Sequence, residues 1–170
     1  AYLLTARVDC SFVRLPGTGA MQCTPLLHDP LLAVLPPMHP LANAPEPIRF
    51  SQLTAEPFLM PTEGKNYDIR TLFKTFSFEP QVAFTMHDDL SLLAMAENGL
   101  GWTILPGLLL NHYTHKAAVK RLETNPYRLI GVATRASQTP SPLVTAFVEL
   151  ALQMAQEFTS KNSISIEQPV

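Results

Sequence analysis

The chain has 170 residues, of which 46% are hydrophobic and 15% are charged, and its formal net charge is −2. This length and apolar content suffice for a buried core in one domain or in two small lobes, so we expect a folded chain. The charge balance supplies no positive field that would attract a phosphate backbone. The composition therefore excludes DNA binding as the task of this stretch of polypeptide.

The apolar runs and the cysteines indicate in which part of the cell the chain is expected. The longest apolar runs, such as residues 100–110, are interrupted by glycine and proline and are shorter than the roughly 20 residues that span a bilayer. Nothing at Ala1 resembles a secretory leader. Cys10 and Cys23 have neither metal-ligand nor redox spacing and suit small buried thiols. We therefore expect a reduced, cytoplasmic protein with no membrane segment.

The first quarter of the chain is rich in turn signals. Residues 3–6 resemble the last turn of a helix, and residues 8–13 form a short β-rich segment, so the chain is expected to begin within a motif. A polar connection with two glycines follows at 16–19. The apolar run 30–35, flanked by prolines, is typical of a buried strand. Many of the sixteen prolines cluster at 36–47, where they indicate a change of chain direction or a hinge.

From residue 50 onward, predicted strands and helices alternate. The predicted strands are 58–60, 81–86, 101–105 and 127–134. The predicted helical segments are a turn at 50–53 and helices at 68–77, 90–96, 108–113 and 142–158. Asp88 and Asp89 are typical N-terminal caps of the third of these segments, and Gly99 is a typical left-handed stop. The alternation predicts an α/β fold with largely parallel sheets.

Three segments together resemble one protein family. Residues 28–36, followed by His-Pro-Leu-Ala at 39–42, resemble a strand and crossing of the effector-binding domains of LysR-type transcriptional regulators. Residues 56–60 resemble the next strand of that family. Residues 86–106, with Gly99-Leu100-Gly101 and a final Leu-Pro, resemble its helix-Gly-x-Gly-strand unit. No single motif is specific, but the order and spacing over nearly the whole chain identify the family.

The resemblance implies two Rossmann-like lobes joined by two crossover strands, as in type 2 periplasmic binding proteins, with a small effector in the cleft between them. The implied first lobe is 1–35 with 131–160, the second is 36–130, and 161–170 is a frayed tail. The implied first lobe lacks its first strand, first helix and second strand, and the N-terminal winged helix-turn-helix is also missing. DNA is then contacted only through that missing domain, and the parent protein forms homodimers and tetramers.

The first group of candidate ligand-binding residues lies between a predicted strand and a predicted helix. Pro61, Thr62, Glu63 and Asn66 occupy the position at which open α/β folds bind ligands, and the loop offers hydroxyl, amide and helix N-terminal donors. An ordinary capped loop is the alternative interpretation.

The second group lies at the next strand-to-helix turn and in the first lobe. His87 and Asp88 follow the strand at 81–86, although Asp88 suits a helix cap better than a ligand contact. Arg14 follows a first-lobe strand and can bind an anionic effector bidentately, or it is a surface arginine. Arg14, Thr62 and Asn66 favour a small carboxylate or other anion, whereas the acidic Glu63 and Asp88 oppose one.

No motif indicates catalysis, a cofactor or a metal. The sequence contains no nucleophile elbow, phosphate-binding glycine loop or zinc-helix motif, and the spacing of His112 and His115 comes with no third ligand. We therefore expect an effector-sensing regulatory domain. A transporter's solute-binding protein is the second hypothesis, and an enzyme on the same scaffold is the third. Residues 68–77 and 108–113 are candidate self-association surfaces, unless they only cover their own sheet.

Overall fold

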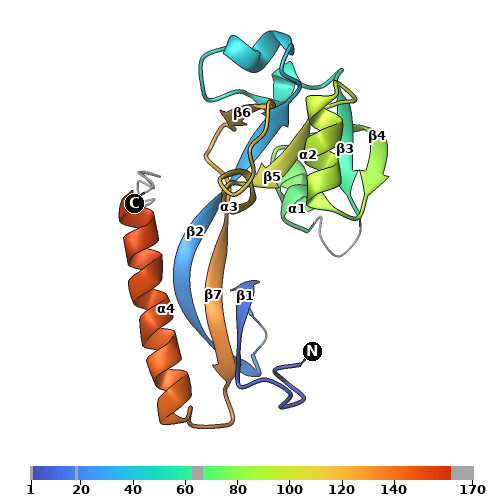
Figure 1. Ribbon diagram of the computed structural model, residues 1–170. Helices are drawn as coiled ribbons and strands as arrows, with labels where there is room; N and C mark the ends of the chain where they lie inside the picture. Colours follow the sequence, from blue (N-terminus) through green and yellow to red (C-terminus); the bar gives the residue numbers. More distant parts are fainter. Residues whose placement is uncertain (1, 18, 63–66, 162–170) are drawn as a thin grey trace. The chain divides into compact units, whose positions relative to one another are not determined.

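The computed structural model describes residues 2–17, 19–62 and 67–161, and the chain forms two compact units. Unit 1 takes in the chain up to Asp29 and from Arg128 onward, and unit 2 is Pro30–Tyr127. The chain therefore passes between the units twice. Figure 1 labels the elements of both units.

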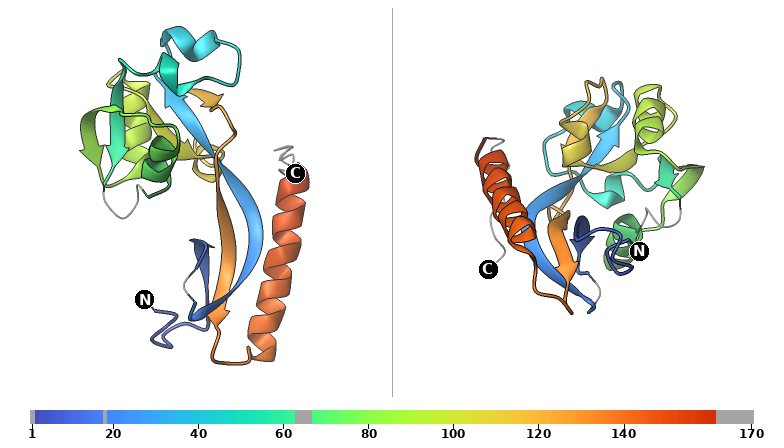
Figure 2. Two further views of the ribbon diagram at one scale, coloured as in Figure 1. Left: turned by 180° about the vertical axis from the view of Figure 1, so that it is seen from behind. Right: turned by 60° about the horizontal axis from the view of Figure 1, so that its bottom comes forward.

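Unit 1 is built on antiparallel strands and one long helix. β1 (Cys10–Leu15) pairs antiparallel with β7 (Tyr127–Arg135), and β7 lies next to β2 (Met21–Leu35). The strands approach closely at Gly131, where a Cβ would lie 2.6 Å from the carbonyl oxygen of Thr24. Helix α4 (Pro142–Lys161) runs alongside these strands in every view (Figures 1 and 2).

Helix α4 has an exposed apolar stripe beside its buried side. Val144 is buried against the sheet, whereas Leu143, Leu150 and Met154 are 80%, 54% and 61% exposed. Phe147 belongs to the same stripe, and its ring centroid lies 6.0 Å from that of Phe12, so the stripe continues onto β1. Unit 1 therefore carries an apolar face that the described residues of this chain do not cover.

Unit 2 combines a parallel strand pair with antiparallel strands. β3 (Pro57–Pro61) and β4 (Gln81–Met86) are parallel, and the C-terminal part of β2 pairs antiparallel with β5 (Thr103–Pro106) and β6 (Ala118–Arg121). The helical segments of this unit are η1 (Pro40–Asn43), η2 (Phe50–Gln52), α1 (Tyr67–Thr75), α2 (Asp89–Glu97) and α3 (Gly107–Leu110).

Alternation along β3 divides the core of unit 2 into two clusters. Phe58 and Met60 pack with α1 and Trp102, whereas Leu59 packs with α2. Successive side chains of a strand point to opposite faces, so one short strand supports a helix on each side. This arrangement holds the carboxyl ends of β3 and β4 in place.

The sequence predicted most elements of unit 2 correctly and several features of the sheets wrongly. The strand expected at 30–35 begins at Met21, and β6 was not expected. The expectation of largely parallel sheets is also wrong, since β1, β5 and β6 all pair antiparallel. Pairing direction depends on contacts distant in sequence, which local periodicity does not encode.

The expected helix end near the N-terminus has a clear hydrogen-bond signature. The N–H of Ala6 donates to the carbonyl of Leu3 at 3.2 Å, and the N–H of Arg7 donates to that of Tyr2 at 3.0 Å. Ala6 has a left-handed φ of 55°. These bonds form the Schellman pattern that closes a helix at its C-terminal end, although the described residues here are turns.

The two expected self-association surfaces are largely internal. Ile69, Leu72 and Phe73 of α1 are buried in the core of unit 2, as is Leu110 of α3, because these short helices cover their own sheet. Among the apolar candidates in 108–113, Tyr113 is the exposed side chain, with 48% of its surface accessible. Of the described residues, the exposed stripe of α4 (Leu143, Phe147, Leu150 and Met154) is longer than either candidate.

Candidate functional site

The parallel strands β3 and β4 bring two of the candidate residues together. Pro61 lies opposite Met86 in the register, so the two strands end at the same edge. The backbone N–H of Thr62 donates to the carbonyl of Met86 at 2.9 Å. Beyond this bond, the Thr62 Oγ1 atom lies 2.9 Å from Nδ1 of His87. The two strand-to-helix turns that carry candidate residues therefore lie side by side in the structure.

The hydrogen bond between Thr62 and His87 can run in either direction. The hydroxyl donates when Nδ1 is unprotonated and accepts when Nδ1 carries the proton, so the tautomer of the ring sets the polarity of the pair. Thr62 is half-buried and the His87 ring is exposed. The pair thus presents an adaptable donor and acceptor at the strand edge, which suits recognition of a polar small molecule.

Asp88 is a helix cap in the structure. Its carboxylate accepts hydrogen bonds from the N–H groups of Leu90 at 3.2 Å and Ser91 at 2.8 Å, and from the Ser91 hydroxyl. Its backbone is extended, with φ −119° and ψ 129°, as the cap position requires. Both carboxylate oxygens are therefore engaged by α2, and an anionic ligand at this helix end would have to compete with them.

The remaining candidate residues are Pro61, Glu63, Asn66 and Arg14. Pro61 is buried at the end of β3 and shapes the start of the loop. Glu63 and Asn66 lie outside the described residues. Arg14 is exposed on β1 of unit 1, opposite Ile130 of β7. The structure thus brings Thr62, His87 and Asp88 together within unit 2 and leaves Arg14 in the other unit.

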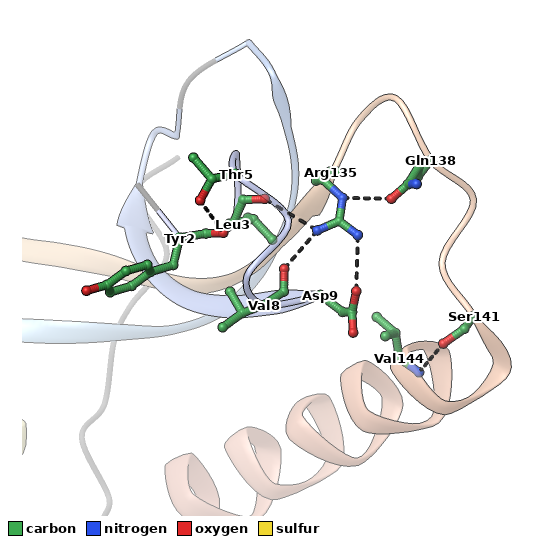
Figure 3. A network of polar contacts seen from close by, with 9 residues as sticks. All are labelled: Tyr2, Leu3, Thr5, Val8, Asp9, Arg135, Gln138, Ser141 and Val144. Carbon is green, nitrogen blue, oxygen red and sulfur yellow. Dashed lines mark hydrogen bonds and ion pairs between the residues drawn. The ribbon is translucent and has the colours of Figure 1, made fainter.

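A polar network that the sequence did not suggest surrounds Arg135 in unit 1 (Figure 3). Its guanidinium donates to the carbonyl of Val8 at 2.8 Å, to Asp9 Oδ1 at 3.1 Å and to Gln138 Oε1 at 2.7 Å. A further contact reaches the carbonyl of Leu3 at 3.4 Å. A polar cavity of about 330 Å³ lies beside this network. Because its charge is paired and its donors are used, Arg135 ties the N-terminal segment to the end of β7.

The part of the chain that the structure describes holds neither a cluster of metal ligands nor a helix able to span a membrane. Among those residues, no three His, Cys, Asp or Glu side chains gather as metal ligands would. None of the described helices combines the length and hydropathy that crossing a membrane takes. Cys10 and Cys23 are both half-buried free thiols.

Comparison with known proteins identifies the family. Residues 2–156 match the family model described as the LysR substrate binding domain. The chain belongs to this family. Among relatives of this LysR domain, LrrA of Synechococcus elongatus, a probable HTH-type transcriptional regulator, is 28% identical over 91% of this chain and 52% of its own length. CatR of Pseudomonas putida, an HTH-type transcriptional regulator, is 27% identical over 91% of this chain and 54% of its own length. The chain thus spans about half of each.

Solved structures show that the LysR domain has the fold that the sequence motifs implied. The effector-binding domain of QuiR in complex with shikimate superposes with a TM-score of 0.77 at 21% identity, over 92% of this chain and 76% of that one. The regulatory domain of CcmR from Synechocystis in complex with 2-PG gives 0.80 at 19% identity, over 91% and 76%. Such domains have the type 2 periplasmic-binding-protein-like fold.

Proposed function

We propose that this LysR domain senses a small metabolite and passes the signal to transcription through a DNA-binding segment elsewhere in a longer protein. The single observation that carries the proposal is the family match over residues 2–156. The relatives that match are named transcriptional regulators, which favours a regulator over a transporter's solute-binding protein. The domain itself is then a non-enzymatic, cytoplasmic module that acts as a homodimer or tetramer in the parent protein.

The effector is proposed to be a small carboxylate or another anion. The related QuiR domain was solved with shikimate, which carries one carboxylate. In this chain the Thr62 Oγ1 atom and the His87 Nδ1 atom, 2.9 Å apart, supply hydrogen-bonding groups at the end of β3 and β4. Arg14 and Asn66 are proposed to add a charge and an amide.

Pro61, Glu63 and Asp88 are the remaining proposed lining residues. Glu63 and the capping carboxylate of Asp88 select against ligands with several negative charges, because like charges repel at short range. The proposed lobes remain 1–35 with 131–160 and 36–130. The cleft between them is proposed to hold the effector, with first-lobe elements supplied by polypeptide upstream of this chain.

Replacing Thr62 with alanine tests the proposed site. A panel of small carboxylates, beginning with shikimate, is titrated against the unsubstituted 170-residue chain and against Thr62→Ala. Thr54→Ala is the control. Thr54 is exposed and its hydroxyl bonds only locally, to the carbonyl of Ser51 at 3.2 Å. Loss of one ligand hydrogen bond weakens binding by about twofold to tenfold, with thermal stability unchanged.

Two results would contradict the proposal. Affinity that is the same for Thr62→Ala and Thr54→Ala excludes Thr62 from the site. A fall in melting temperature that matches the fall in affinity assigns Thr62 a structural role at the end of β3.

A further inference from the structure

Unit 2 contains a cavity of about 390 Å³ between α1 and β4. Met60, Phe73 and Phe78 form its apolar floor, and the Phe73 and Phe78 ring centroids are 5.2 Å apart. This volume lies within the range of about 300–1,000 Å³ that is usual for small-molecule sites. None of its lining residues belongs to the candidate site at Thr62 and His87.

Val82 and Thr85 of β4 form one wall of the cavity. Both line it because the pairing of β4 with β3 is shifted by one residue. Phe58 pairs with Val82, but the next pair is Leu59 with Phe84 and then Met60 with Thr85. This one-residue shift lets Val82 and Thr85 face the same side, although strict alternation would separate them. The cavity is therefore bounded by an apolar side chain and by a hydroxyl that can donate a hydrogen bond.

Two basic residues stand at the rim. Arg70 and Lys74 are one turn apart on α1, both are exposed, and both line the cavity. Neither makes a hydrogen bond or an ion pair with any residue that the structure describes. Glu79 also lines the cavity, so the rim carries a net charge of about +1, counted from two cations and one carboxylate.

We propose that this cavity binds a small organic monoanion, with its carboxylate between Arg70 and Lys74 and its apolar body on Phe73 and Phe78. Arginine matches a carboxylate bidentately, and lysine adds a second positive charge to the same group. Aromatic rings below the rim shield the body of the ligand from water. Glu79 disfavours a second negative charge, so monoanions are preferred to dianions.

A matched pair of probes tests the chemistry. Phenylacetate and the neutral phenylacetamide share one apolar body, and each is titrated against the ¹⁵N-labelled 170-residue chain. Trp102, the single tryptophan, gives a second signal, because its ring centroid lies 6.4 Å from that of Phe73 and 6.2 Å from that of Phe78. We expect saturable shifts of the Phe73, Val82 and Thr85 amides with phenylacetate and much weaker binding of phenylacetamide.

Substitutions then locate the site. Lys74→Gln is compared with Lys116→Gln, which removes an equally exposed lysine from unit 2 outside the cavity. Exposed ion pairs are worth little, so Lys74→Gln is expected to weaken phenylacetate binding by about twofold to fivefold, and Lys116→Gln to leave it unchanged. Val82→Trp fills the cavity and is expected to abolish binding, while circular dichroism shows that the chain remains folded.

Three results would overturn the proposal. Equal affinity for the neutral and the anionic probe removes the role of the two cations. Shifts confined to Thr62 and His87 place the probe at the other site. Equal effects of Lys74→Gln and Lys116→Gln would mean that the overall electrostatic field of the protein attracts the probe, and not a site beside Lys74.

Discussion

Gly101 is the position at which a single methyl group should damage unit 2 most. Its φ is +151°, and a Cβ built there would lie 2.4 Å from the carbonyl oxygen of Pro57 and 3.2 Å from Cδ2 of Leu59. The neighbouring N–H of Trp102 donates to that same Pro57 carbonyl at 2.9 Å. The close approach that joins β5 to β3 thus depends on the absence of a side chain.

The cost of Gly101→Ala has three parts. The backbone conformation costs an L-residue about 1–2 kcal/mol. The clash is with backbone atoms that no rotamer change relieves, which adds about 1–3 kcal/mol. The displaced hydrogen bond adds about 1 kcal/mol. We expect a total loss of about 3–6 kcal/mol in the free energy of unfolding.

Gly99→Ala is the matched control, because Gly99 also has a positive φ, +79°, but nothing lies within 4 Å of its added Cβ. Only the backbone term remains, so the loss should be about 1 kcal/mol. Urea unfolding followed by the fluorescence of Trp102, the single tryptophan, reports on unit 2 directly. Equal unfolding midpoints for the two variants would refute the steric argument.

Three further changes test other parts of the molecule. Asp88→Ala removes the cap of α2 and should cost about 1 kcal/mol in urea unfolding. Asp29→Asn removes the charge of a fully buried side chain whose Oδ2 lies 2.8 Å from Nε of Arg128, and should cost about 1–3 kcal/mol in urea unfolding followed by circular dichroism, which also reports on unit 1. Arg128 is 29% exposed, which keeps this below the cost for a fully buried pair. Replacing Leu150 and Met154 together by serine should lower light scattering without lowering the melting temperature, since both are exposed; a lower melting temperature would show that this face is packed.

Elements with local signals were predictable from the sequence. β4 has the predicted bounds, Gln81–Met86, and α2 begins after its aspartate cap and is followed by a left-handed Gly99. Caps and stops act within one turn, so their residue types are sufficient evidence. The proximity of Thr62 and His87 was predictable for a related reason, because parallel strands end at the same edge.

Features that depend on distant residues were not predictable. The N-terminal half of β2 was missed because Pro25 lies within it and interrupts the apolar pattern. The Arg135 network joins Arg135 to Leu3 across 132 positions of sequence, and no local pattern records such a pair. Arg70 and Lys74 have the spacing of an ordinary solvated helix face, and only the tertiary placement of α1 and β4 leaves a cavity beside them.

The sequence by itself determined the family, most of the elements of unit 2 and the two turns that carry Thr62 and His87. Each of these follows from residue types at short spacing, where backbone preference and capping act directly. Tertiary structure alone decided the antiparallel pairing of β1, β5 and β6, the Arg135 network, and which apolar stripe of α4 stays exposed. Each of these features depends on which distant surface packs against a side chain, and the spacing of residues along the chain does not specify that partner.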